Sequence, residues 1–200
     1  MTSRRNLLKA GAVAGASAWI APSVLAIDRV GAAAPSSICE VPSVSDGAMW
    51  LDPPPPVLFE GGAYDSNVNT FVFAEQGPVQ LTSPITVNRT TAGTFGGTSN
   101  PGGTIPAGTW VCSYFIVGDR LDDSGILTGA LSFASSSILG LIYRRDLLLA
   151  SASLANPGVT YDYRPMESND QMIFDGGGSL SWSMNFGGGL DEIRIITTCP

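Results

Sequence analysis

The sequence predicts an all-β fold, an antiparallel β-sandwich or jelly roll with at most one short helix. About nine or ten short segments rich in β-branched and aromatic residues alternate with turns that contain Gly and Pro. Only residues 144–154 have the leucine-rich composition of a helix. A parallel α/β sheet would require repeated helical crossovers of about a dozen residues each, which this sequence lacks.

The best-defined strand covers residues 109–117, between Gly108 and Gly118. Alternate residues of a strand point to opposite faces of its sheet. Here one face would carry Trp110, Cys112, Tyr114 and Ile116, and the other Val111, Ser113, Phe115 and Val117. Both faces are largely apolar, so we expect a central strand that a second sheet covers on one side.

Turn signals separate the remaining predicted strands. These strands are residues 57–60, 70–75, 79–81, 85–87, 126–133, 137–143, 171–174, 179–185 and 192–197. We expect 126–133 and 137–143 to pair with each other through a turn near 134–136. Residues 91–103 contain five glycines, which predicts a long surface loop.

The N-terminus predicts export. Residues 3–9 (SRRNLLK) resemble a twin-arginine translocation motif, an apolar segment follows, and residues 24–26 (VLA) offer small residues for cleavage. We expect a signal peptide over 1–26 that is cleaved after Ala26. It would direct the protein through the twin-arginine translocase to the periplasm or the cell exterior. An uncleaved signal anchor and processing after Ala34 are the alternatives. A Pro-rich arm (27–56) and a β-sandwich domain (57–200) then complete the predicted organisation.

The charge of the chain excludes some partners. The formal charge is -7, and removal of residues 1–26 takes three of the ten basic residues and no acidic one, which leaves -10. A surface of this sign repels nucleic acid and anionic membranes. No second apolar run has the length of a membrane span, so we expect none after cleavage.

Three cysteines leave at least one thiol free or paired between chains. We expect a disulfide between Cys39 and Cys199, near the two ends of the mature domain, with Cys112 as a small buried apolar residue. A Cys39–Cys112 disulfide is the competing pairing. An exported protein permits either.

Residue types limit the chemistry. The chain has no histidine, and Lys9 is its only lysine, which excludes a Ser-His-Asp triad and a lysine Schiff base in the mature protein. Paired carboxylates remain as a route to glycoside hydrolysis, and the candidates are Glu60, Glu75 and Glu167, each with any nearby aspartate. No spacing selects a pair, so we expect no enzymatic activity and name no catalytic residue.

Two loops are candidates for ligand binding. Asp119, Asp122 and Asp123 form a dense acidic loop whose carboxylates could bind calcium, or which is simply a solvated turn; no other cofactor is expected. Residues 161–164 (Tyr161, Asp162, Tyr163 and Arg164) could form a carbohydrate platform, or the tyrosines could pack their loop onto the sheet.

Other conspicuous residues are given structural roles. We expect Trp110 and Trp182 in the core, because both lie in apolar strands. We expect Asp191 to accept backbone amides in its turn and Arg194 to pair with a carboxylate such as Asp170.

Several motifs occur in an order that carries a family resemblance. They are residues 103–111 (GTIPAGTWV), 113–115 (SYF), 127–133 (LTGALSF), 138–142 (ILGLI), 157–161 (PGVTY) and 191–197 (DEIRIIT). The chain resembles a family of exported bacterial β-sandwich domains often found in proteins with a PEP-CTERM-type sorting anchor. The resemblance implies a sandwich fold and export, and it carries over no activity.

Together these features predict an exported, soluble, non-enzymatic β-sandwich protein with an extracytoplasmic or surface interaction role, whose partner is a glycan or a surface protein. A carbohydrate-binding module with structural calcium is the first alternative. A jelly-roll glycoside hydrolase that uses paired carboxylates is the second.

Overall fold

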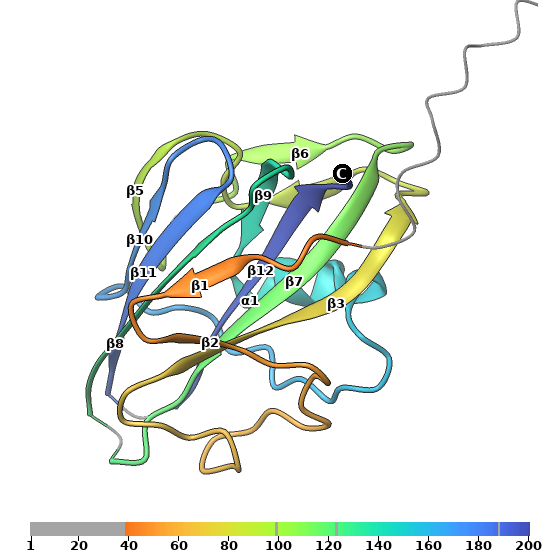
Figure 1. Ribbon diagram of the computed structural model, residues 1–200. Coiled ribbons are helices and arrows are strands. Elements are labelled where there is room, and N and C mark those ends of the chain that lie inside the picture. Colours follow the sequence, from red (N-terminus) through yellow and green to blue (C-terminus); the bar gives the residue numbers. More distant parts are fainter. Residues whose placement is uncertain (1–38, 99, 123, 188) are drawn as a thin grey trace, which may run out of the picture. The chain divides into compact units, whose positions relative to one another are not determined.

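Two five-stranded β-sheets pack against each other in the computed structural model, which describes residues 39–98, 100–122, 124–187 and 189–200 (Figure 1). The first sheet has the strand order β1 (Ser43–Ser45), β8 (Gly125–Ser132), β11 (Ser179–Phe186), β10 (Gln171–Phe174) and β5 (Gly93–Gly96). The second sheet has the order β2 (Ala48–Trp50), β3 (Thr70–Gln80), β7 (Trp110–Gly118), β12 (Asp191–Thr198) and β9 (Ile138–Ile142). A smaller sheet pairs β4 (Ile85–Val87) with β6 (Gly103–Ile105). The predicted all-β sandwich is confirmed, while the predicted signal peptide and its cleavage site at Ala26 lie outside the described residues.

Strand β7 is the central strand of the second sheet, as the sequence predicts. It pairs antiparallel with β3 on one side and with β12 on the other. Cys112, Tyr114 and Ile116 face the first sheet and belong to the core between the two sheets. Phe115 and Val117 face the opposite side, where a second apolar cluster forms. Both faces of β7 are therefore buried.

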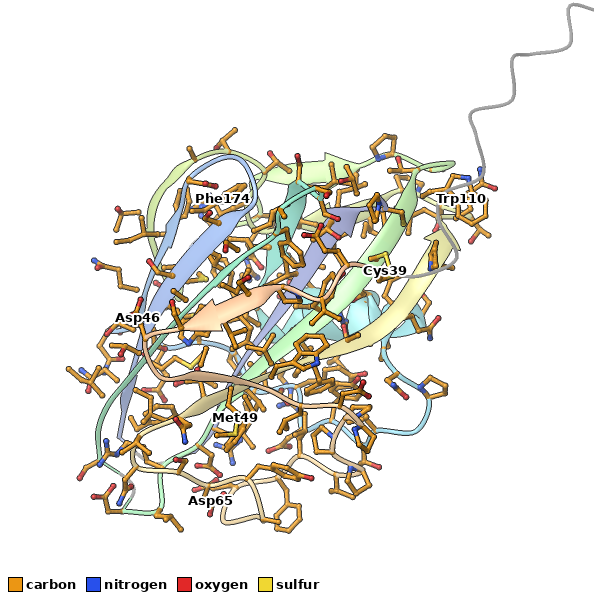
Figure 2. All side chains as sticks on the ribbon, in the orientation of Figure 1. Cys39, Asp46, Met49, Asp65, Trp110 and Phe174 are labelled. Atoms are coloured by element: carbon orange, nitrogen blue, oxygen red, sulfur yellow. A yellow bond between two sulfur atoms is a disulfide. The ribbon has the colours of Figure 1, made fainter. Side chains whose placement is uncertain are left out.

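The prediction for Trp110 is wrong, because its side chain is 42% exposed. The register between β7 and β12 ends at Val111, so Trp110 extends past the last row of the core. Figure 2 shows Trp110 at the edge of the sandwich. Trp182, on β11, is buried as predicted, and its indole N–H donates to the hydroxyl of Thr70 over 3.1 Å.

Part of the predicted N-terminal arm belongs to the sandwich. Strand β1 pairs with β8 in the first sheet, and β2 pairs in parallel with β3 in the second sheet. An Asp46-Gly47 turn joins the two strands, and both residues have positive φ angles of 54° and 94°. The chain crosses from one sheet to the other at this turn, so the sandwich begins before residue 57.

Four other strand predictions need correction. The predicted strands 70–75 and 79–81 form one continuous strand, β3. Residues 57–60 form no strand and make only an isolated bridge from Val57 to Thr160. The predicted loop 91–103 contains β5, which completes the edge of the first sheet. Strands β8 and β9 do not form a hairpin, because β8 pairs with β1 and β11 whereas β9 pairs with β12 in the other sheet.

Helix α1 (Arg145–Ala150) and a 3₁₀ turn (Ala152–Leu154) follow β9. Leu147, Leu148 and Leu154 are buried in the apolar cluster on the outer side of the second sheet. This segment agrees with the predicted short helix over residues 144–154. Among the described residues, no helix is long and apolar enough to cross a membrane.

A buried ion pair joins β3 to β12 under this helix. Arg194 donates from Nε and Nη2 to the two carboxylate oxygens of Glu75 over 2.6 and 2.7 Å, and neither side chain is exposed. The hydroxyl of Ser113 donates to Glu75 over 2.6 Å. Arg194 Nη1 donates to the carbonyl of Leu148 and to Ser151, which ties the end of α1 to the sheet.

The prediction that Arg194 pairs with a carboxylate is confirmed, but the partner is Glu75 and not Asp170, the example given. Ile193 and Ile195 of β12 face the core between the sheets, so Arg194 faces the opposite side, where Glu75 lies. Asp170 instead precedes β10 of the first sheet. Alternate side chains of β12 point to opposite faces of the sheet, and this alternation determines which carboxylate Arg194 contacts.

Replacing Arg194 by Leu should destabilise the protein by about 3–5 kcal/mol, because it leaves Glu75 buried without its cation. Denaturation in urea measures the change. The double variant Arg194→Leu with Glu75→Gln should lose less than the sum of the two single variants. Additive losses would contradict a direct coupling between the two side chains.

Candidate functional site

The outer face of the first sheet is an exposed surface of small polar side chains. Along β11 (SLSWSMNF) the residues alternate, so that Leu180, Trp182 and Met184 enter the core and the intervening serines point outward. Strand β8 alternates in the same way, with Leu127 and Leu131 buried. The alternation of the pleat thus separates an apolar inner face from a hydroxyl-rich outer face.

The register of the strands places these outward side chains in rows across the sheet. One row consists of Ser43, Ser132 and Ser179. The next row consists of Ser45, Ala130, Ser181 and Ile173, and a third consists of Thr128, Ser183 and Gln171. We call these ten residues the hydroxyl face. Seven of them carry a hydroxyl group, and none of the ten is charged.

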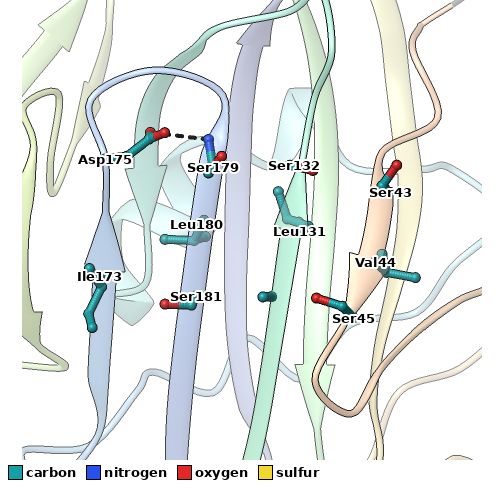
Figure 3. A pocket seen from close by; sticks show the side chains of 11 residues that line it. Ser43, Val44, Ser45, Leu131, Ser132, Ile173, Asp175, Ser179, Leu180 and Ser181 are labelled. Carbon is teal, nitrogen blue, oxygen red and sulfur yellow. Dashed lines mark hydrogen bonds between the residues drawn. The ribbon is translucent and has the colours of Figure 1, made fainter.

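An open groove of about 340 Å3 lies over the first two rows (Figure 3). Its lining residues come from four neighbouring strand regions of the first sheet: Ser43, Val44, Ser45, Ala130, Leu131, Ser132, Ile173, Asp175, Ser179, Leu180 and Ser181. The groove runs across β1, β8, β11 and the end of β10. It is therefore built on rigid strands and is open to solvent.

Asp175 is the charged residue that lines this groove, and its carboxylate is occupied by its own turn. Oδ1 accepts the amides of Gly177 and Ser179 over 2.7 and 3.1 Å. Burial alone would raise the pKa of Asp175, but these amide hydrogen bonds outweigh burial and lower the pKa. Asp175 thus closes the β10–β11 hairpin and marks one end of the groove.

The chemistry of the hydroxyl face fits an uncharged ligand with many hydroxyl groups. A serine or threonine hydroxyl both donates and accepts hydrogen bonds, and it rotates to suit its partner. An anionic ligand would find no cationic side chain in the groove to compensate its desolvation, and the Asp175 carboxylate of the groove is held by the amides of its own turn. The sequence analysis missed this face, although the alternation of Ser with Leu, Trp and Met in residues 179–184 was its signal.

The predicted carbohydrate platform at residues 161–164 is instead packed onto the second sheet. Tyr161 and Tyr163 stack on each other with their ring centroids 5.4 Å apart, and the Tyr161 ring contacts Phe115 at 4.8 Å. The guanidinium of Arg194 lies 5.9 and 6.0 Å from the two tyrosine rings. Both tyrosines are half-buried, so this stack covers the buried ion pair.

Asp162 and Arg164 frame the same loop. Arg164 forms ion pairs with Asp162 over 3.1 Å and with Glu60 over 2.7 Å. Its backbone amide donates to the carboxyl group of Glu192 over 2.6 Å. These contacts give the loop a structural role, which was the alternative interpretation of the four residues.

Two of the predicted calcium ligands have different surroundings and different partners. Asp119 is buried, and its Oδ2 accepts the amide of Gly61 over 3.1 Å. Asp122 is exposed and forms a two-point contact with Arg120 over 2.9 and 3.1 Å. Asp123 lies outside the described residues. Within the described ranges, no group of three or more acidic, Cys or His side chains could hold a metal ion.

Buried carboxyl groups gather where β7 ends and β12 begins. Burial, with a hydrogen bond to Asp65 and its charge, raises the pKa of Asp119 to about 7. Burial and the charge of Asp170 raise the pKa of Asp191 to about 8. Burial also raises the pKa of Glu192 to about 8, and the Oε1 atom of Glu192 has no hydrogen-bond partner in the described part of the chain.

The sequence predicts that Asp191 accepts backbone amides in its turn, but its described contact is a different one. It shares a hydrogen bond with the carboxyl group of Asp170. Asp170 is the residue that accepts amides, from Glu167 and, over 2.7 Å, from Asn185. Carboxyl groups in hydrogen-bond contact are closer than the roughly 5–10 Å separation of glycosidase pairs, so this arrangement does not provide that geometry.

The three glutamates considered for hydrolysis lie in separate surroundings. Glu75 is buried against Arg194, and Glu60 pairs with Arg164. Glu167 is exposed, and its backbone carbonyl accepts the amide of Asp170 over 3.2 Å. No two of these glutamates line the same described groove, whereas Glu167 and Asp191 both line a small groove of about 120 Å3.

A second groove, of about 560 Å3, lies beside α1 and includes Arg144, Arg145 and Asp146. Arg144 pairs with Asp146 over 3.0 Å, and Arg145 donates to the carbonyls of Asp162 and Tyr163. These contacts engage part of the hydrogen-bond donors of both arginines. We take the groove on the hydroxyl face as the better candidate, because it presents the exposed Ser43, Ser132 and Ser179 in one row across neighbouring strands.

The disulfide prediction also needs correction. Cys39 is bonded to Cys112, which was the competing pairing, and Cys199 is the free cysteine. The α-carbons of Cys39 and Cys112 are 5.9 Å apart, because the chain before β1 passes close to the start of β7. Cys112 is buried as predicted, but as half of a disulfide.

The comparisons with known proteins give no family. We found no protein-family model, no curated protein and no solved structure that matches this chain. The functional argument therefore depends on the fold and on the sites described above.

The buried carboxyl groups predict that stability decreases as pH rises. The pKa values of Asp119, Asp191 and Glu192 are raised in the folded protein, whereas unfolded carboxyl groups titrate near pH 4. The folded state thus holds extra protons between about pH 4 and pH 8, and their stabilising effect is lost across that range. We expect the free energy of unfolding, measured in urea, to be lower at about pH 8.5 than at about pH 5.

Replacing Asp191 by Asn should flatten this pH dependence, because the amide is neutral at every pH in the range. Asp146→Asn, at an exposed position on α1, is the matched control and should leave the slope unchanged. A free energy of unfolding that rises between about pH 5 and pH 8.5 would contradict this assignment.

Proposed function

We propose that this protein is an exported, non-enzymatic β-sandwich protein that binds an uncharged polysaccharide on its hydroxyl face. The observation that carries the proposal is the set of hydroxyl rows beneath an open groove on one side of the first sheet. The carbohydrate-binding alternative is thus moved from the tyrosine loop to the sheet. Calcium forms no part of it.

The distribution of charge supports an uncharged ligand. The chain carries a formal charge of -7, yet the hydroxyl face has no charged side chain. An anionic polysaccharide would be repelled by the protein as a whole and would find no arginine on this face. A neutral polymer avoids both costs, and its hydroxyl groups can exchange hydrogen bonds with those of the serines.

Two isoleucines add apolar contact to the polar rows. Ile173 lies in the second row and is 51% exposed, and Ile126, next along β8, is 56% exposed. The C–H faces of sugar rings can pack against such side chains. Because no aromatic ring of the described chain lies in the three rows, we expect weak binding per sugar and preference for a long chain that contacts several rows.

Two observations support an extracytoplasmic location. The twin-arginine-like motif at residues 3–9 is an export signal by its pattern. The Cys39–Cys112 disulfide is typical of proteins that fold or function in an oxidising compartment. A non-enzymatic role is supported by the absence of histidine from the sequence and by the structural contacts of Glu60 and Glu75.

Binding to polysaccharides tests the proposal. We expect the protein to sediment with at least one insoluble neutral polymer, such as cellulose or chitin, or to be retarded in gels that contain a soluble neutral glucan. Retention should change little with salt, because no ion pairs form. Ser132→Asp and Ser181→Asp should each weaken binding about tenfold or more, since each places a charge under the ligand.

Ser83→Asp is the matched control, because Ser83 is an exposed serine in the connection between β3 and β4, outside the hydroxyl face. It should bind like the unmodified protein, and all three variants should melt at similar temperatures. The proposal fails if no neutral polymer retains the protein. It also fails if the two sheet variants bind as well as the control.

A further inference from the structure

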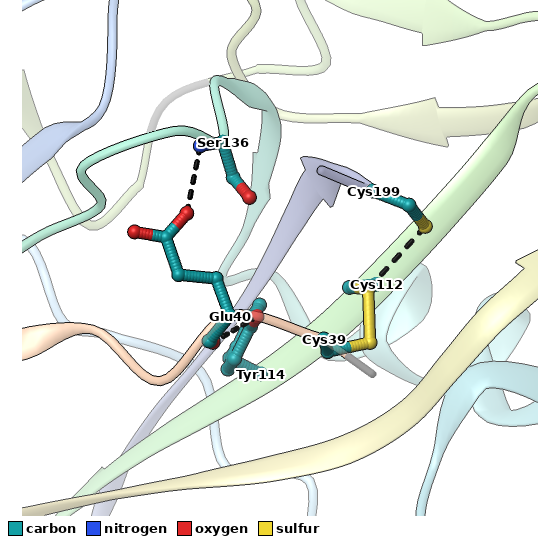
Figure 4. The surroundings of a disulfide bond; sticks show 6 residues. All are labelled: Cys39, Glu40, Cys112, Tyr114, Ser136 and Cys199. Atoms are coloured by element: carbon teal, nitrogen blue, oxygen red, sulfur yellow. Dashed lines mark hydrogen bonds between the residues drawn. A yellow bond between two sulfur atoms is a disulfide. The ribbon is translucent and has the colours of Figure 1, made fainter. Parts of the chain in front are cut away.

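Three sulfur atoms converge near the start of β7 (Figure 4). Cys112 is bonded to Cys39, and the free Sγ of Cys199 lies 3.3 Å from the Sγ of Cys112. Cys199 directly follows β12, whose last residues pair with Val111 and Cys112. The fold therefore holds a thiol in contact with one particular sulfur of a disulfide.

We propose that this cluster is an intramolecular thiol–disulfide exchange site, at which Cys199 displaces Cys39 from Cys112. The Cys199 thiol loses its proton, and its sulfur forms a bond to the Sγ of Cys112. The Cys39–Cys112 bond breaks at the same time, and Cys39 leaves as a thiolate that takes up a proton from solvent. One disulfide and one thiol are present before and after, so no oxidant or reductant is consumed.

Because Cys112 is buried, attack on its sulfur by the Cys199 thiol is favoured over attack by a thiol from solution. Cys112 is fully buried, which shields its sulfur from thiols in solution. Cys199 is already in contact with that sulfur, and reactants held in contact behave as if at a very high local concentration. The exchange is therefore directed at Cys112 and at its bond to Cys39.

The site contains a restraint on the rate. Burial raises the pKa of the Cys199 thiol, which lowers the fraction present as the reactive thiolate at neutral pH. Tyr114 lies close by and donates its hydroxyl proton to the carbonyl of Glu40. The exchange should therefore accelerate as pH rises.

The residue next to Cys39 is anchored independently of the disulfide. The carboxylate of Glu40 accepts the backbone amides of Ala134, Ser135 and Ser136, the last over 2.8 Å. Exchange would thus change the covalent link at residue 39 and leave β1 in place. It moves the free thiol from Cys199 to Cys39, which is half-buried at the start of the described chain and becomes the group open to covalent modification.

Disulfide mapping of the full, non-reduced chain tests the proposal. The protein is incubated at about pH 6 or about pH 9, acidified to stop exchange, and labelled with a maleimide before proteolysis and mass spectrometry. At the lower pH we expect the label on Cys199 and an intact Cys39–Cys112 link. At the higher pH a fraction should carry the label on Cys39 and a Cys112–Cys199 link, with one label per chain throughout.

Two variants separate the proposed step from other routes. Cys199→Ser should keep the Cys39–Cys112 link and give no labelled Cys39 at either pH. Cys39→Ser leaves Cys112 beside Cys199, and a mild oxidant should join them in a monomer at a rate that does not depend on protein concentration. Label on Cys199 alone at both pH values, or failure of Cys39→Ser to form the Cys112–Cys199 bond, would overturn the proposal.

Discussion

The ion pair between Arg194 and Glu75 is the interaction on which the second sheet depends. It joins β3 to β12 across β7, and its remaining hydrogen bonds reach Ser113 and the end of α1. A buried guanidinium is tolerated only when its donors are satisfied, so helix, sheet and tyrosine loop must all be in place around it. This requirement explains why the stacked Tyr161 and Tyr163 serve the core and do not form an open platform.

The two sides of the sandwich differ in how they use polar groups. The outer side of the second sheet buries an ion pair beneath α1 and the tyrosine loop, and carboxyl groups gather at the end of β7 and β12. In the described part of the chain, no helix covers the outer side of the first sheet, and most of the polar groups there are hydroxyls that are exposed or half-buried. The buried ion pair and the buried carboxyl groups therefore lie away from the hydroxyl face, where Asp175 at one end of the groove is bound to its own turn.

Much of the fold could be predicted from the sequence, because the alternation in residues 109–117 and 179–185 and the Gly/Pro turns report local geometry directly. Which strands pair with each other could not be predicted, since β8 and β9 are adjacent in sequence yet belong to different sheets. The candidate site was missed for a related reason: its serines come from β1, β8 and β11, and only the register brings them together. The pairing of Cys39 with Cys112, and of Arg194 with Glu75, likewise depends on contacts between distant segments that local patterns do not encode.

The most direct test of the account is to map where a neutral polysaccharide touches the protein. Amide chemical shifts of 15N-labelled protein, followed during titration with a soluble neutral glucan, report the contact residue by residue. Our account predicts amide shift changes concentrated in β1, β8, β10 and β11. The amides of residues 161–164 and of the residues around Asp191 should be unaffected. Changes confined to the tyrosine loop, or no change at any amide, would contradict it.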